Sequence, residues 1–122
     1  MTYLEKAKES VAAAERAVSE GQFTVAGNEA ILGIIAANDA AMGLVFKVVS
    51  DSPNHSDAVG VFRERFDSED DLKYSKYLTR LLNKKQQFMY EGRILTSTEA
   101  SGMAGDARTF LDWVEKRTKD LI

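Results

Sequence analysis

The chain has 122 residues with no cysteine, one proline and eight glycines, and its formal net charge is −3. This length suits a single domain over residues 1–122, and the lack of cysteine excludes a disulfide framework and a thiolate metal site. With 29% charged and 44% hydrophobic residues the composition is that of a globular protein, and the negative net charge argues against a general affinity for nucleic acid.

The first two predicted elements are an amphipathic helix and an apolar one. From Tyr3 to Glu20 apolar residues recur every three or four positions, which predicts a helix with one buried face. Gly21 interrupts it, and a second helix is expected from Gln22 to about Val48. Apolar side chains surround this second helix, so we expect it to be the central helix of the fold rather than a membrane span.

Glycines in this central helix lower its helical propensity and predict a close approach by another helix or by a partner chain. They are Gly27, Gly33 and Gly43.

Three further helices are expected in the second half of the chain. Ser52-Pro53 matches a capping residue and a proline at the first position of a short third helix, which ends near Asp67-Ser68. The acidic run Glu69–Asp71 suits the start of a fourth helix that continues to about Met89. Thr96-Ser97-Thr98-Glu99 is a capping box that opens the fifth. The sequence therefore predicts an all-α fold, an antiparallel up-and-down bundle of four to five helices.

The amino-terminal residues do not have the order of a secretion signal. Met1 to Lys6 mixes apolar and charged residues, without the basic, apolar and small-residue regions of a signal peptide. We therefore expect a cytoplasmic protein that makes no contact with a membrane.

The predicted fourth helix carries a stripe of cations within an arc of about 80°. The cations are Lys73, Lys76, Arg80 and Lys84, and Gln87 lies in the same arc. Such a stripe can track a phosphate backbone with an affinity that falls as salt rises. An ordinary solvated helix face explains the same pattern.

Three other polar residues are candidate binding residues. Asn28 and Asp39 lie eleven positions apart on the central helix and so on nearly the same face, where they could line a site or make ordinary hydrogen bonds. His55, the only histidine, could serve in chemistry or make local hydrogen bonds near a helix start. The Glu-x-x-His pattern of a carboxylate metal site is missing, because Ser52 stands three positions before His55, and we expect neither a metal nor a cofactor.

Four stretches of the chain together carry a family resemblance. They are Asn28–Ala40, His55–Ala58, Leu81–Tyr90 and Ala104–Trp113. In their order along the helices they resemble the HEPN family (higher eukaryotes and prokaryotes nucleotide-binding) in its small bacterial stand-alone form. The resemblance covers nearly the whole chain.

The resemblance implies a catalytic site in altered form. Active members are metal-independent ribonucleases that pair an arginine and a polar residue with a nearby histidine, in a site assembled across a homodimer. The matching positions are Lys85, Gln86 and Tyr90. Tyrosine, with a pKa of about 10, is a poor general base at neutral pH, and lysine holds a phosphate only as a point charge.

The resemblance thus favours a HEPN-like domain, dimeric, that binds a nucleotide, RNA or a partner protein with reduced or no ribonuclease activity. It also implies a nucleotidyltransferase as partner, because the family is commonly paired with one in toxin–antitoxin modules. Two alternatives stay open. One is a working endoribonuclease toxin in which Lys85, Tyr90 and His55 replace the usual pair, and the other is a plain protein-interaction bundle.

Overall fold

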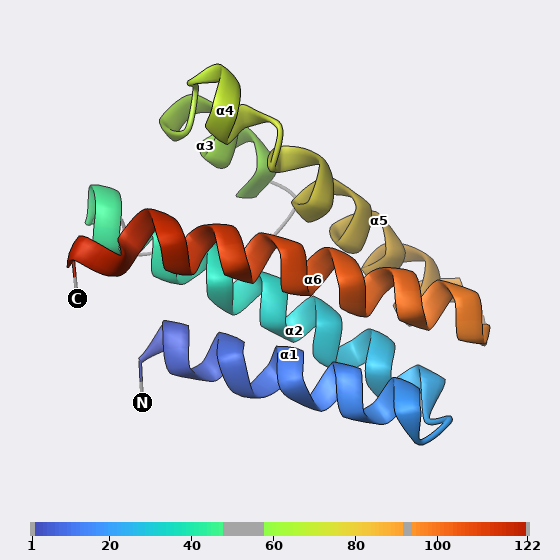
Figure 1. The fold of residues 1–122 in the computed structure, drawn as a ribbon. Coiled ribbons are helices and arrows are strands. Elements are labelled where there is room, and N and C mark those ends of the chain that lie inside the picture. Colours follow the sequence, from blue (N-terminus) through green and yellow to red (C-terminus); the bar gives the residue numbers. More distant parts are fainter. Residues whose placement is uncertain (1, 48–57, 92–93, 122) are drawn as a thin grey trace.

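The computed structural model describes residues 2–47, 58–91 and 94–121, and every regular element within them is helical. The elements are α1 (Tyr3–Ser19), α2 (Phe23–Ala41), a π-helical segment (Met42–Phe46), α3 (Ala58–Arg65), α4 (Glu69–Leu72), α5 (Ser75–Glu91), α6 (Ser97–Thr118) and a 3₁₀ turn (Lys119–Leu121). The long helices α1, α2, α5 and α6 alternate in direction, and both termini lie at the same end of the molecule (Figure 1). The predicted all-α, antiparallel up-and-down bundle is therefore confirmed.

Helix α1 forms as its sequence predicts. Thr2 caps it, since its hydroxyl accepts from the Glu5 amide at 3.1 Å and the Glu5 carboxylate accepts from the Thr2 amide at 3.1 Å. The buried residues recur at helical spacing along one face. Gly21, with φ of 75°, then makes the tight turn that lays α1 antiparallel against α2.

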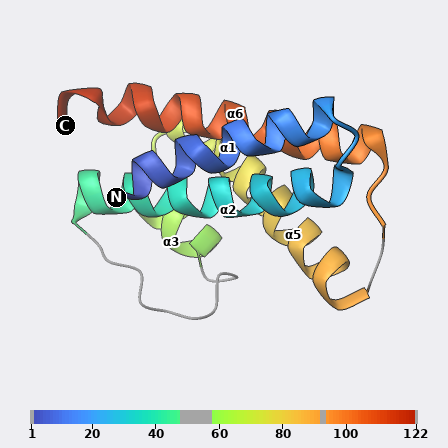
Figure 2. The ribbon, with the colours of Figure 1, turned by 90° about the horizontal axis from the view of Figure 1, so that it is seen from below.

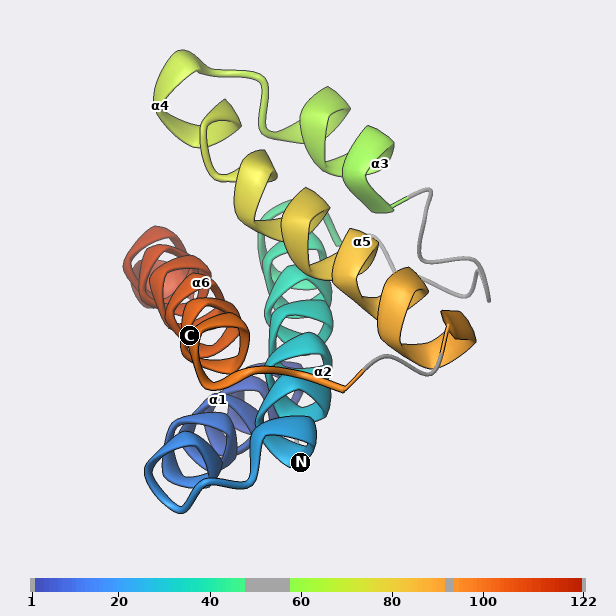
Figure 3. The ribbon, with the colours of Figure 1, turned by 90° about the vertical axis from the view of Figure 1, so that its right-hand side faces the viewer.

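Helix α2 is the central helix. It packs against α1, α5 and α6, and most of its residues are buried (Figure 3). Phe23–Phe46 is long and apolar enough to cross a membrane, but 56% of its most apolar window is buried inside the bundle, as expected of a core helix.

Two glycines of α2 meet neighbours of the same chain at close range. A β-carbon at Gly33 would lie 2.8 Å from Val11 Cγ2, and one at Gly27 would overlap the side chain of Leu95. The close approach predicted from these glycines is thus made inside the chain.

The α-helical conformation of the central helix ends earlier than expected. Its α-helical part ends at Ala41 and the π-helical segment continues to Phe46, where Lys47 ends the helix in the left-handed conformation, with φ of 56°. The predicted cap at Ser52-Pro53 and His55 lie outside the described residues.

The prediction of a single helix from Glu69 to Met89 is wrong, because the chain forms α4 and α5 with a turn between them. The turn carries Tyr74, whose amide bonds to the Asp71 carbonyl at 3.0 Å. Tyr74 stacks on Trp113 of α6, with ring centroids 4.9 Å apart. We attribute the break to this tertiary contact, which local helical propensity does not contain.

An aromatic cluster joins the smaller helices to α6. Phe62 of α3 is fully buried and lies 5.8 Å from Phe110 and 5.5 Å from Trp113 between ring centroids. Phe66 packs 5.1 Å from Trp113. Such pairs add to the stabilisation that the buried area itself provides.

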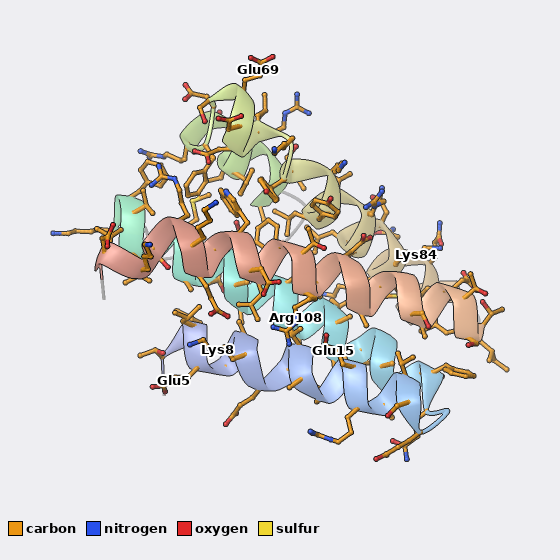
Figure 4. All side chains as sticks on the ribbon, in the orientation of Figure 1. Glu5, Lys8, Glu15, Glu69, Lys84 and Arg108 are labelled. Carbon is orange, nitrogen blue, oxygen red and sulfur yellow. The ribbon has the colours of Figure 1, made fainter. Side chains whose placement is uncertain are left out.

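A surface ion pair connects α6 to α1. Arg108 donates from Nη2 and Nε to the Glu15 carboxylate at 2.6 and 3.1 Å, and the two side chains point toward each other in Figure 4. The hydrogen bond to Glu15 raises the pKa of Arg108 above its ordinary value.

The contact at Gly33 predicts the response to a single methyl group. Gly33→Ala should lower the free energy of unfolding by about 1–3 kcal/mol, because α1, which carries Val11, must move away from α2. The new β-carbon of Gly105→Ala on α6 meets no atom within 4 Å in the part of the chain that the structure describes, and the substitution should stabilise the domain by up to about 1 kcal/mol through helical propensity. Urea unfolding followed by circular dichroism measures both. Equal effects of the two substitutions would contradict the close α1–α2 contact.

Candidate functional site

The residues matched to the family's catalytic positions all lie in the second half of α5. Lys85 stands one helical turn after Leu81, which is fully buried, so it continues the face of α5 that points into the bundle. Lys85 is only partly buried, since this part of α5 tilts away from α2 (Figure 2). It makes no ion pair with any side chain that the structure describes.

Of the other two positions in the predicted trio, only the side chain of Gln86 lies in the described part of the chain. Gln86 is exposed on the next position of the helix. The backbone of Tyr90 is helical, but its side chain, like the whole of His55, lies outside the described part of the chain. The structure therefore brings the three positions onto one helix end.

The predicted stripe of cations is divided by the break before α5. Lys73 falls in the turn between α4 and α5, whereas Lys76, Arg80 and Lys84 lie on α5. Lys76 is exposed, with its ammonium 5.1 Å from the ring centre of Tyr77. The prediction that all four cations form one continuous stripe on a single helix is therefore wrong.

Arg80 and Lys84 form ion pairs with α6. Arg80 donates to both oxygens of Asp106, from Nη2 at 2.8 Å and from Nε at 3.1 Å, and Lys84 donates to Glu99 Oε2 at 3.3 Å. The Arg80 side chain is 53% exposed and that of Lys84 33%, so both cations remain within reach of solvent. Both cations on this face of α5 are therefore paired with carboxylates of α6.

These ion pairs cross a groove between α5 and α6, which has a volume of about 530 Å³. We call it the α5–α6 groove. It is lined by Arg80, Leu81, Asn83, Lys84 and Gln87 of α5, Thr98 in the first turn of α6, and Glu99, Gly102, Met103 and Asp106 further along α6. Its volume is in the range of sites that bind small molecules.

The charged groups of the α5–α6 groove balance one another, but one buried hydrogen-bond acceptor does not find a partner among the described residues. Two cations face two carboxylates, so the groove carries no net formal charge from these four groups. Gln87 Oε1 is buried and has no hydrogen-bond partner among the residues that the structure describes. An unpaired buried acceptor costs about 1–3 kcal/mol, so a donor that reached it would stabilise the site.

The two polar candidates on α2 do not form one site. Asn28 is exposed, and Asp39 is partly buried about 16 Å further along the helix axis. Asp39 lines a separate, mainly apolar hollow beside Tyr3 and Leu4 at the start of α1.

Lys73 lines another hollow, between α4 and the second half of α6. Its cations, Lys73, Lys116 and Arg117, are matched by the carboxylates Asp70, Asp71 and Asp112. Arg117 pairs with Asp71 at 3.4 Å.

No group of three or more His, Asp or Glu side chains within residues 2–47, 58–91 and 94–121 is placed to hold a metal ion. Sequence reasoning missed Glu99 and Asp106 as partners of the cations. Their spacing of seven residues on α6 is visible in the sequence and puts them on one helix face. Only the register between α5 and α6 sets them opposite Lys84 and Arg80.

Comparison with known proteins agrees with this helical architecture. The family model described as HEPN domain matches residues 1–117, which is nearly the whole chain. No curated protein and no solved structure matches the chain. Because the family model spans the bundle from α1 to the last turn of α6, the chain belongs to the HEPN domain family.

Proposed function

We propose that this HEPN domain binds RNA or a nucleotide and has reduced or no ribonuclease activity. The observation that carries the proposal is the set of residues on α5. This helix presents cations, but it has Lys85 and Tyr90 where active members of the family have arginine and histidine. Lys85 can attract a phosphate, since it is partly exposed and makes no ion pair within the described side chains. Without histidine the site lacks a proton carrier that works near neutral pH.

The first test restores the family's residues at these positions. The purified protein, incubated without metal with total RNA or transfer RNA, should bind RNA and leave it intact. The double variant Lys85→Arg, Tyr90→His should produce defined fragments at a rate at least about a hundredfold above the wild type, which is the lower end of what a positioned acid–base group contributes.

Two controls separate this proposal from a working nuclease. Lys85→Ala and Tyr90→Phe should leave the RNA as intact as the wild-type protein leaves it. Wild-type cleavage that both substitutions abolish would contradict the proposal and favour the endoribonuclease toxin. A folded protein that binds no RNA or nucleotide would favour a protein-interaction bundle.

We also propose that the domain acts as a homodimer through the uncovered face of α2. Val25 and Leu32 lie seven residues apart on this helix and are 48% and 49% exposed, although the rest of the helix is largely buried. Large apolar side chains on one exposed helix face are typical of protein interfaces. Gly27 and Gly33 give this dimer no support, since contacts within the chain account for them.

A charge placed on this face tests the dimer. Leu32→Glu should convert a dimer to a monomer in light scattering at micromolar concentration, because the interface would have to bury an unpaired carboxylate. Leu121→Glu, at a residue 51% exposed in the last turn, is the matched control and should stay dimeric. A wild-type monomer would contradict the dimer, and a dimeric Leu32→Glu variant would contradict this interface.

A further inference from the structure

The α5–α6 groove combines a pair of cations with Gln87 Oε1, an acceptor that has no hydrogen-bond partner in the described part of the chain. Arg80 and Lys84 stand one helical turn apart on the same wall, and Gln87 lies one further turn along. Lys85, at the position matched to the family's arginine, is turned about 100° from Lys84 around α5. The α5–α6 groove is therefore a different surface from the matched catalytic positions.

The opposite wall leaves room for a ligand. Gly102 of α6 lines the groove and is exposed, and a β-carbon built on it meets no atom of the described residues within 4 Å. A ligand can therefore lie against the α6 backbone at this point, between the two ion pairs formed by Asp106 and Glu99.

The existing ion pairs indicate which ligand charge fits. Each cation already holds a carboxylate, and Arg80 does so through two parallel hydrogen bonds. A phosphate presents the same acceptor geometry with greater capacity, and both cations are solvent-accessible enough to exchange one anion for the other. The carboxylates of α6 thus occupy the cations until a phosphate displaces them.

The buried acceptor indicates which base fits. Gln87 Oε1 needs an N–H donor, and the terminal torsion of a glutamine is broad enough to turn this oxygen into the groove that the side chain lines. Adenine and cytosine offer an exocyclic amino group, whereas uracil offers a carbonyl in its place. An amide side chain is a common partner of adenine.

We infer that the α5–α6 groove binds one nucleotide with an amino-bearing base, within an RNA strand or free. Its phosphate replaces the α6 carboxylates on Arg80 and Lys84, and its base donates to Gln87. The inference rests on the RNA or nucleotide binding proposed above and gives it a location, a base preference and a built-in competitor.

The decisive experiment places a large side chain at Gly102, so that it occupies the space in the α5–α6 groove. Fluorescence anisotropy with a labelled oligo(A) of about twelve nucleotides measures the affinity, since such lengths cover a single-strand binding site. Gly102→Leu should weaken binding at least about tenfold, the loss expected when a stacked or paired nucleotide is excluded. Gly105→Leu, a glycine of the same helix that does not line the groove, should stay within about twofold. Both substitutions raise helical propensity, so neither should unfold the domain.

A second pair of variants tests the competing carboxylate. Asp106→Asn should tighten oligo(A) binding, by several-fold at low salt, because Arg80 is released to the phosphate, and it should steepen the logarithmic salt dependence by about 0.7. Asp112→Asn removes the same charge from α6 at a residue paired with Arg108 outside the groove, and it should change neither quantity appreciably.

The base contact has its own measurement. Wild-type protein should prefer oligo(A) to oligo(U), and Gln87→Met, which keeps the side-chain volume, should lose that preference. Displacement of the labelled RNA by millimolar AMP would identify a free nucleotide as a sufficient ligand, and its absence would assign the site to the RNA strand.

The outcomes separate the groove from the broader proposal. Unchanged binding by Gly102→Leu, or equal losses in Gly102→Leu and Gly105→Leu, would overturn the groove while RNA binding elsewhere on the domain still stands. A wild type that binds neither oligonucleotide nor AMP would overturn both.

Discussion

The fold depends on burying α2 on nearly all sides. This helix is apolar around most of its circumference, and α1, α6 and α5 each cover a part of it. Gly33 lets α1 approach at Val11, and Gly27 accommodates Leu95, which leads into α6. Because the central helix cannot face water on these sides, the positions of the other long helices follow from its surface.

Helix α5 separates two kinds of surface. Its inner face is anchored by the fully buried Leu78 and Leu81, and the same face carries Lys85 where the helix tilts away from α2. Its flank toward α6 carries Arg80 and Lys84, held by Asp106 and Glu99. A domain with a net charge of −3 can therefore offer cations locally while neighbouring carboxylates keep them neutralised in the absence of a ligand.

The aromatic cluster holds the start of α5 in place. Tyr74 stacks on Trp113, and Phe62 of α3 packs on the same tryptophan. These contacts end α4 and begin α5, and thereby fix the direction in which α5 crosses α6. The register of Arg80 and Lys84 against the α6 carboxylates is a consequence of this anchoring.

The sequence alone determined the class of fold, because helical periodicity, the capping residues Thr2 and Thr96 and the turn at Gly21 act over a few neighbouring residues. It also located the candidate cations and the positions matched to the family's catalytic residues, since these are matters of residue type and spacing. Only the tertiary structure decided three features: the helix break at Tyr74, the position of Lys85 on the inner face of α5, and the pairing of Arg80 with Asp106, 26 residues away. Such contacts depend on how two helices are set against each other, and that register is fixed by the packed core rather than by any local pattern.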